Sequence, residues 1–303
     1  MYIIKKSNWS YTKLLIISIL FNILLISYAH AKKDVESALL LAHHLASNGY
    51  FDDAITEYYR AIFWEESDKS LLCSAHLRMG LCYREIHEWD KAIYCFQHAE
   101  RIAPNDSLLE RIKIATASID IVLGKYGLAQ IRLLSLINRS NYKILQQQEV
   151  LLLITSAILE LDWEKTKNFL DQFGDYINCE VKSRMKEILE IAINRKQKSP
   201  RLAKWLSTFI PGLGQSYAND NRNALNAFIL NGFNFSTTGY FLYYNEYYNA
   251  FLYFIFIGER YYSGNRYQAQ QSVYKHETRI NDNYMKELLT IIKGDLNGKK
   301  SIY

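Results

Sequence analysis

Between residues 37 and 173 one pattern of apolar and polar positions returns four times. An aromatic residue marks each return, with spacings of 38, 37 and 37 residues: Phe51, Trp89, Tyr126 and Trp163. Three positions after each aromatic residue lies a small one: Ala54, Ala92, Ala129 and Thr166. A period of roughly 20–50 residues is typical of repeat proteins, whose neighbouring units stack to share one core. We therefore predict a repeat array over this part of the chain.

The second copy indicates what one unit contains. Gly80 lies in a first predicted helix, and Ala92 and Phe96 lie four positions apart on the facing side of a second. Residues 87–90 between them, His-Glu-Trp-Asp, predict a tight turn. Pro104 ends the unit, because the residue before a proline is biased away from helical angles. Each unit is thus predicted as two helices joined by a turn.

A further apolar stripe follows the fourth copy and predicts a helix over residues 177–196 that caps the array. Its members are Val181, Met185, Ile188, Leu189 and Ala192. Basic residues then become dense between Arg195 and Lys204, around Ser199-Pro200, and we predict a domain boundary there.

Beyond this boundary lie two runs without charge. No residue from Asn223 to Asn245 is charged, and neither is any from Tyr247 to Gly258, with Glu246 between them. The first run is long enough for a bilayer, which needs about 20 residues, although its asparagines are costly in hydrocarbon unless paired. Tyrosine, abundant here, is enriched at membrane–water interfaces. We predict that residues 202–262 form a helical hairpin inserted in, or lying on, a membrane; the alternative is a soluble helical domain with an unusually aromatic core.

The N-terminus has the features of a secretory signal. Three lysines precede an apolar segment from Leu14 to Ile26. Ala29-His30-Ala31 then offers small residues on either side of a cleavable bond. We predict a signal peptide over residues 1–31, with an uncleaved anchor as the alternative. Either would export residues 32–200 and place the protein in the periplasm or cell envelope, associated with a membrane.

Export conflicts with a simple membrane-spanning hairpin. The basic cluster 195–204 would lie on the exported side, whereas such clusters are preferred in the cytoplasm. This favours shallow insertion, attachment through anionic head groups, or a membrane other than the cytoplasmic one. The net charge of +5, or 5 − 3 = +2 without Lys5, Lys6 and Lys13, is too small to favour nucleic acid as a partner.

The repeats resemble the tetratricopeptide repeat. The residues that carry the resemblance most clearly belong to the second copy: Gly80, Tyr83, Ala92, Phe96, Ala99 and Pro104. It covers about 140 residues and is weakest in the fourth copy, where Thr166 replaces an alanine. The resemblance implies an all-α, curved solenoid whose first helices line an inner surface. Three prolines in 303 residues also favour helices.

The resemblance further implies which residues would line that inner surface. They are Leu39, His43, Leu77, Leu81, Arg84, Ile114, Ser118, Leu151 and Thr155. Some members of the family bind a C-terminal carboxylate through lysine and asparagine at these places, but this chain has leucine, isoleucine and histidine there. We therefore expect an apolar groove for a partner helix or peptide. The alternative is that the chain's own capping helix or C-terminal unit fills the groove.

A second resemblance lies in the C-terminal third. A P-G-x-G-Q-x-Y turn followed about 50 residues later by an aromatic-Gly-Asn segment is similar to a module of uncharacterised bacterial membrane-associated proteins, for which no activity is implied. Its residues here are Pro211, Gly212, Gly214, Gln215, Tyr217, Gly264 and Asn265. Residues 218–221 depart from that module, in which a glycine usually follows the tyrosine. Physically, Pro211 ends a helix, and the first two glycines permit backbone angles or close approach that other residues do not.

The chain therefore divides into four predicted parts. These are the signal peptide 1–31, a tetratricopeptide-like solenoid with its capping helix over 32–198, a hydrophobic aromatic-rich helical unit over 199–276, and a polar tail with one short amphipathic helix over 277–303. No H-E-x-x-H, G-x-S-x-G or P-loop sequence is present, and the four cysteines lack zinc-site spacing. We expect no enzyme activity, cofactor or metal. Buried free thiols are favoured, although a Cys82–Cys95 disulfide is conceivable.

Two hypotheses on function follow. In the first, the protein is a non-enzymatic interaction scaffold, exported and held at a membrane by residues 202–262, in an envelope or membrane-protein assembly. In the second, the function lies in residues 202–262 as a membrane-embedded assembly or pore-like component, and the repeats are its docking platform.

Overall fold

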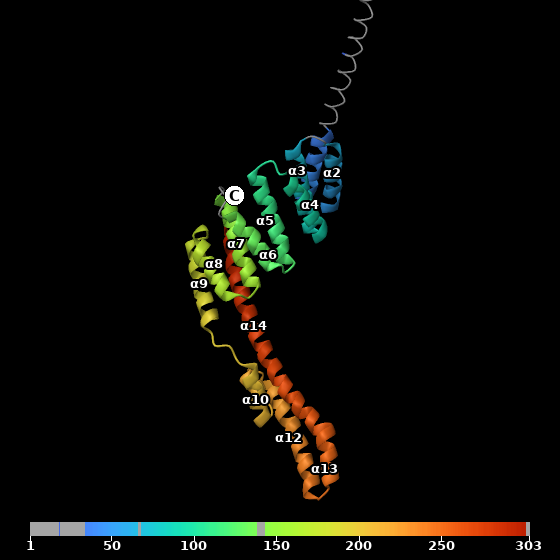
Figure 1. Ribbon diagram of the computed structural model, residues 1–303, viewed down its shortest axis with the longest axis vertical. Helices are drawn as coiled ribbons and strands as arrows, with labels where there is room; N and C mark the ends of the chain where they lie inside the picture. The colour runs from blue at the N-terminus through green and yellow to red at the C-terminus, as the bar shows by residue number, and fades with distance from the viewer. Residues whose placement is uncertain (1–17, 19–33, 66–67, 138–142, 301–303) are drawn as a thin grey trace, which may run out of the picture. The chain divides into compact units, whose positions relative to one another are not determined.

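The computed structural model describes residues 18, 34–65, 68–137 and 143–300. All secondary structure in the described residues is helical (Figure 1), so the all-α prediction is confirmed. The predicted signal peptide lies outside the described residues except for Ser18. The chain divides into two compact units, Met1–Ser156 and Ala157–Tyr303.

The first unit is an array of helix hairpins, compatible with a tetratricopeptide-like fold. Its helices are a segment over 34–47, α2 (Phe51–Trp64), α3 (Lys69–Glu85), α4 (Trp89–Ile102), α5 (Asp106–Val122), α6 (Tyr126–Ile137) and α7 (Lys143–Leu159), the last of which continues into the second unit. From α2 to α6 each helix packs against the next in the chain, as Figure 1 shows for α2, α3 and α4.

The repeated aromatic residue begins the second helix of each pair. Two positions before it the backbone takes the left-handed conformation in all four copies, with φ values of 83°, 62°, 72° and 61°: Gly49, His87, Gly124 and Leu161. One residue later, a backbone N–H donates to the carbonyl five positions earlier, as from Tyr50 to Leu45 at 3.0 Å. This pattern ends the first helix and turns the chain directly into the second.

The core of the first unit explains the small residues of the pattern. Ala54 and Ala92 are fully buried, and so are the larger rings of Tyr58 and Phe96. A Cβ atom on Gly80 would lie 2.5 Å from the Phe96 ring, so the glycine makes room for the aromatic residue. The cysteines at 73, 82 and 95 are buried free thiols, and burial raises the pKa of Cys82 and Cys95 to about 11.

The second unit contains the remaining helices. They are α8 (Trp163–Phe173), the 3₁₀ turn η1 (Gly174–Tyr176), α9 (Cys179–Asn194), α10 (Pro200–Phe209), α11 (Leu213–Tyr217), α12 (Asn221–Tyr243), α13 (Tyr247–Tyr253), the π-helical segment η2 (Phe254–Gly258) and α14 (Glu259–Lys300). Helix α12 runs beside α13, η2 and α14, and α10 beside α14, which gives the hairpin seen in Figure 1.

The boundaries differ from the predicted ones in two respects. Helix α9 buries all five residues of the predicted capping stripe but packs on α8 and α14, so it belongs to the second unit. The short helix expected after residue 276 is the last part of α14, which begins at Glu259. The helix continues because Ala269 and Val273 pack into the second unit's core, and Leu288 is buried further along.

The basic segment predicted as a boundary is tied down within the second unit. The Arg195 guanidinium pairs with the Glu277 carboxylate at 2.5 Å, and the Lys198 N–H donates to the same carboxylate at 3.0 Å. The Lys198 ammonium donates to the Tyr217 carbonyl at 2.7 Å. Burial alone would raise the pKa of Glu277, but the hydrogen bonds from Arg195 and Lys198 hold it below its usual range. The segment therefore joins α9 to α10 by specific contacts with α14 and α11.

Candidate functional site in the second unit

The nine predicted groove residues are less accessible than expected. Leu77 and Leu151 are buried, and the other seven are half-buried. The His43 ring lies 5.7 Å from the Tyr58 ring, and burial, with the charge of Arg78, lowers its pKa. Because Leu77 packs in the core, it contributes mainly to stability. A partner groove formed by the half-buried residues stays a prediction.

The two glycines of the P-G-x-G-Q stretch are required by close packing. Gly212 has φ of 91°, and a Cβ atom there would collide with the Ala224 carbonyl. A Cβ on Gly214 would collide with the Ala203 carbonyl and with Ser207. The expectation of close approach is thus confirmed for both. Gly264 has open space around it, so the same reason does not apply to that position.

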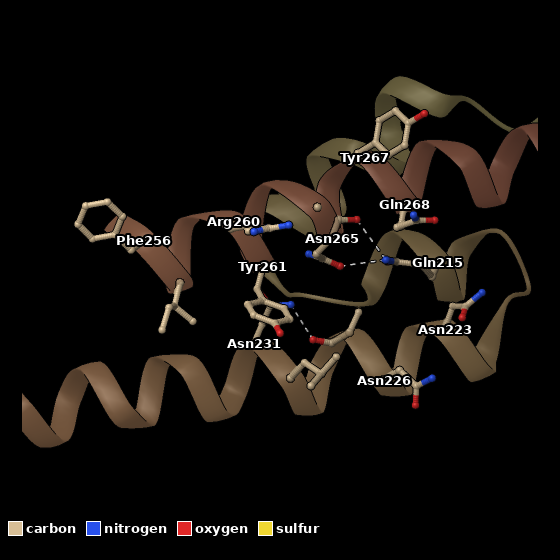
Figure 2. A pocket seen from close by; sticks show the side chains of 14 residues that line it. Gln215, Asn223, Asn226, Asn231, Phe256, Arg260, Tyr261, Asn265, Tyr267 and Gln268 are labelled. Carbon is tan, nitrogen blue, oxygen red and sulfur yellow. Dashed lines mark hydrogen bonds between the residues drawn. The ribbon is translucent and has the colours of Figure 1, made fainter. Parts of the chain in front are cut away.

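Buried amides join the two halves of the motif, which are about 50 residues apart. The Gln215 side chain donates to the Asn265 side-chain oxygen at 2.9 Å and to its carbonyl at 3.2 Å. Asn265 also accepts from the Gly212 N–H and donates to the Ser207 carbonyl at 3.1 Å. Ser207 donates to Gln215 at 3.0 Å and accepts from the Gly214 N–H at 2.9 Å. Figure 2 shows the Gln215–Asn265 pair at the centre of this network.

The residues around the network fix the ends of two helices. Pro211 follows the end of α10, and the Tyr217 hydroxyl accepts from the Ser199 N–H at 3.1 Å. Asn219 takes the left-handed conformation, with φ of 60°, that a glycine would adopt easily. Asp220 then caps α12 and accepts from the Ser272 hydroxyl at 2.8 Å. Residues 218–221 therefore form the turn without the glycine of the module, because Asn219 takes the left-handed conformation and Asp220 caps the next helix.

Beside the network lies an open cleft of about 830 Å³ between α12 and the return leg formed by η2 and α14 (Figure 2). Its polar lining consists of amide side chains, two tyrosines and one arginine: Gln215, Asn223, Asn226, Asn231, Asn265, Gln268, Tyr261, Tyr267 and Arg260. Its apolar lining includes Leu230, Phe256 and Ile257. Arg260 is the single charged side chain among the lining residues.

Asparagines of α12 are buried and hydrogen-bonded. Asn231 donates to the Ala227 carbonyl at 2.8 Å, and Asn234 donates to the Leu230 carbonyl at 2.7 Å. The Tyr253 hydroxyl donates to the Asn234 side-chain oxygen at 2.8 Å. The inner face of the hairpin is therefore amide-rich, and its two buried asparagines are paired inside the unit.

The outer faces of the same hairpin are apolar. The exposed side chains of α12 include Phe228, Ile229, Phe233 and Tyr243, and Phe233 is 68% exposed. On α13, Phe251 is 61% exposed. The small buried cluster of this part contains Ala203, Ala218, Ala269 and Val273, with Tyr217 partly buried against it. The aromatic residues thus lie on the surface here, contrary to the alternative of an aromatic core.

Sequence reasoning missed the cleft and the presence of Arg260 in its lining. A signal was present, because the asparagines at 223, 226, 231 and 234 fall on one face of a helix with 3.6 residues per turn. Among the described residues, no three His, Cys, Asp or Glu side chains are grouped closely enough to hold a metal ion. None of the described helices meets the length and hydropathy criteria for a membrane span.

No protein-family model matches the chain, and a search of curated proteins finds no significant similarity.

Proposed function

We propose that this protein is a non-enzymatic, exported interaction scaffold held at a membrane by the hairpin of residues 202–262, in an envelope or membrane-protein assembly. Its first unit would be a tetratricopeptide-like array that binds a protein or peptide, and its second unit would carry the bacterial membrane-associated module. The observation that carries the proposal is the reversed polarity of the hairpin. Its inner face is amide-rich, and its outer faces are phenylalanine, isoleucine, leucine and tyrosine.

Reversed polarity favours contact with lipid for a physical reason. Proteins that do not bind a membrane or a partner rarely expose large contiguous apolar patches, since exposing them to water is unfavourable. Polar side chains within membranes face the interior of a helix bundle and are paired there. Asn231 and Asn234 meet this condition, so their cost in hydrocarbon is largely offset.

The charges indicate how the hairpin would be oriented. Glu246, at the tip between α12 and α13, is the only charged residue from 223 to 258, and Arg260 follows on the return leg. From Tyr247 to Gly258, α13 and η2 together would extend roughly 18 Å at about 1.5 Å per residue. We infer that the hairpin inserts tip first, with Arg260 at the level of the lipid head groups.

The scaffold role rests on the first unit. Arrays of helix hairpins present extended surfaces to partner proteins, and seven of the predicted groove residues are only half-buried. Arg84 is the arginine among them, and within the described part of the chain its ion pair is with its neighbour Glu85, at 2.7 Å. An Arg84→Glu variant should therefore weaken capture of a partner without disturbing the core.

Flotation with phospholipid vesicles tests the membrane part. The full mature chain should float with the vesicles and resist an alkaline carbonate wash. A Phe228→Asp/Phe233→Asp/Phe251→Asp variant should remain at the bottom of the gradient, because it places charge on the lipid-facing surface. The matched control is Phe63→Asp/Tyr94→Asp, which changes exposed aromatic residues of the first unit, 77% and 59% exposed. If wild type fails to float, or both variants behave alike, the proposal is wrong.

A further inference from the structure

We propose that the cleft between α12 and the return leg binds a membrane lipid with an anionic phosphate head group. The head group would lie at Arg260 and the neighbouring amides, and an acyl chain would lie along the apolar end. This inference rests on the proposed function and adds a specific ligand class to it. It is argued from the charge, the donors and the polarity gradient of the cleft.

Arg260 is an exposed arginine that forms no ion pair among the described residues. No carboxylate is among the described residues that line the cleft. A guanidinium offers five N–H donors in a planar arrangement that matches phosphate oxygens. The cleft therefore favours an anion with several acceptor oxygens.

Further donors line the cleft beyond Arg260, on the side away from Phe256. The side-chain amides of Asn226 and Gln268 line the cleft, and among the described residues neither has a hydrogen-bond partner. The Tyr261 and Tyr267 rings lie along the same return leg. Figure 2 shows Gln268 on the return leg, and Asn223 and Asn226 on α12, all beyond Arg260 as seen from Phe256. One guanidinium and neutral donors in the same cleft suit a phosphodiester, whose single charge one arginine can neutralise.

The opposite end of the cleft is apolar. Phe256 lies at the far end from Gln268 in Figure 2, and Leu230 and Ile257 line the cleft with it. The ligand that matches such a gradient is an amphiphile with a small anionic head. A cleft of about 830 Å³ lies within the size range of small-molecule sites, roughly 300–1,000 Å³.

The direction of the gradient agrees with the proposed insertion. Phe256 lies nearer in sequence to the tip at 244–246, whereas Gln268 lies farther along α14. A lipid in the cleft would thus have its head at the base of the hairpin and its chain toward the tip. This is the orientation that a lipid has beside a hairpin inserted tip first.

Native mass spectrometry of the full chain in a mild detergent tests the site. Dioleoylphosphatidylglycerol should bind more tightly than dioleoylphosphatidylcholine, whose head group has no net negative charge. Arg260→Gln should lower the phosphatidylglycerol affinity by about tenfold to a hundredfold, as expected for loss of a charge-assisted hydrogen bond. Arg260→Lys should retain part of it. The matched control is Arg222→Gln, an exposed arginine of α12 outside the cleft lining.

Two further variants and one soluble probe complete the test. Phe256→Asn should weaken lipid binding, and a thermal unfolding curve checks that each variant folds. Competition by sn-glycerol 1-phosphate at the same concentration as the lipid would overturn the lipid assignment in favour of a soluble phosphate compound. Equal effects of Arg260→Gln and Arg222→Gln, or no effect of Arg260→Gln, would overturn the site.

The failure of this inference can be told from failure of the proposed function. If the full chain floats with vesicles but Arg260→Gln binds phosphatidylglycerol normally, the cleft assignment is wrong and membrane attachment stands. If the full chain does not float, membrane attachment itself is wrong.

Discussion

The hairpins of the first unit and the hairpin of α12 and α13 share a backbone turn but bury opposite kinds of side chain. Asn245, at the tip, is left-handed with φ of 60°, and the Glu246 N–H donates to the Phe241 carbonyl five positions earlier. The four repeats have the same turn. Yet the first unit buries Tyr58 and Phe96, whereas the second exposes Phe233 and buries asparagine.

This difference shows that the turn of a helix hairpin and the surroundings that suit the hairpin are determined by different residues. A left-handed residue and one backbone hydrogen bond suffice to reverse a helix in either unit. The side chains that face inward then decide what surrounds the hairpin. An apolar interior with a polar surface suits water, and an amide-rich interior with an apolar surface suits lipid or an apolar partner.

The largest expected effect comes from the amide-rich base of the second unit. Gly214→Ala should lower the free energy of unfolding by roughly 3–4 kcal/mol, because its Cβ would collide with the Ala203 carbonyl and displace Ser207 from the network. Gly264→Ala, at an interior position of α14 with open space at its Cβ, should instead stabilise by up to about 1 kcal/mol. Hydrogen exchange of α10, α11 and α14 measures both; equal protection in the two variants would show that the network does not organise this base.

The second prediction separates the units by pH. Glu149 on α7 is fully buried, and neither carboxyl oxygen has a hydrogen-bond partner among the residues that the structure describes. Burial together with Glu110 raises its pKa to about 7. Because the folded-state pKa of Glu149 is raised, its protonation stabilises the folded state. This stabilisation is fully present below about pH 4.5 and is lost as pH rises through about 7. The first unit should lose roughly 3 kcal/mol over that range.

Hydrogen exchange of α5 and α7 at pH 5 and pH 8, corrected for intrinsic rates, measures this loss. Glu149→Gln should abolish most of the pH dependence and stabilise α7 at pH 8, while Glu36→Gln, at an exposed position, should change neither. The amides of the second unit do not titrate, so α12 should respond much less. A pH profile for Glu149→Gln that matches wild type would contradict this assignment.

The smallest effect concerns the shared turn. Leu161 occupies the left-handed position that Gly49 occupies in the first copy. Leu161→Gly should stabilise the protein by about 0.5 kcal/mol, because relief of the backbone strain exceeds the entropy cost of glycine. Gly49→Ala, whose Cβ would meet no atom within 4 Å, should destabilise by about 1 kcal/mol through the backbone alone. Chemical denaturation compares the two; changes of the same sign would show that the positions are not equivalent.

Local features of the fold could be predicted from the sequence. The 37- or 38-residue period of the aromatic residues predicted pairs of helices joined by tight turns. The turn expected over residues 87–90 ends earlier, since Trp89 already begins α4. Helix α9 and its buried stripe followed from the spacing of the apolar residues, whereas its packing on α8 and α14 did not. The requirement for Gly212 and Gly214 followed from what a missing Cβ permits.

The candidate site could not be derived in the same way. Its cleft depends on how α12 lies against η2 and α14, and the uncharged run masked the polar face of α12. Arg260 and Asn226 are 34 positions apart in the sequence, so no local pattern joins them. The unpaired carboxyl of Glu149 was missed for the same reason, since Glu110 lies on a different helix.

The central claim is that the tip of the hairpin enters lipid, and an environment-sensitive label tests it most directly. A nitrobenzoxadiazole group would be attached at Phe251→Cys in a Cys179→Ser background, because Cys179 is the exposed native thiol. The same label at Tyr94→Cys, on α4, is the control. With vesicles, the label at 251 should brighten, shift to shorter wavelength and be quenched by spin labels on the acyl chains, and the label at 94 should not. An unchanged spectrum at 251 would contradict the account.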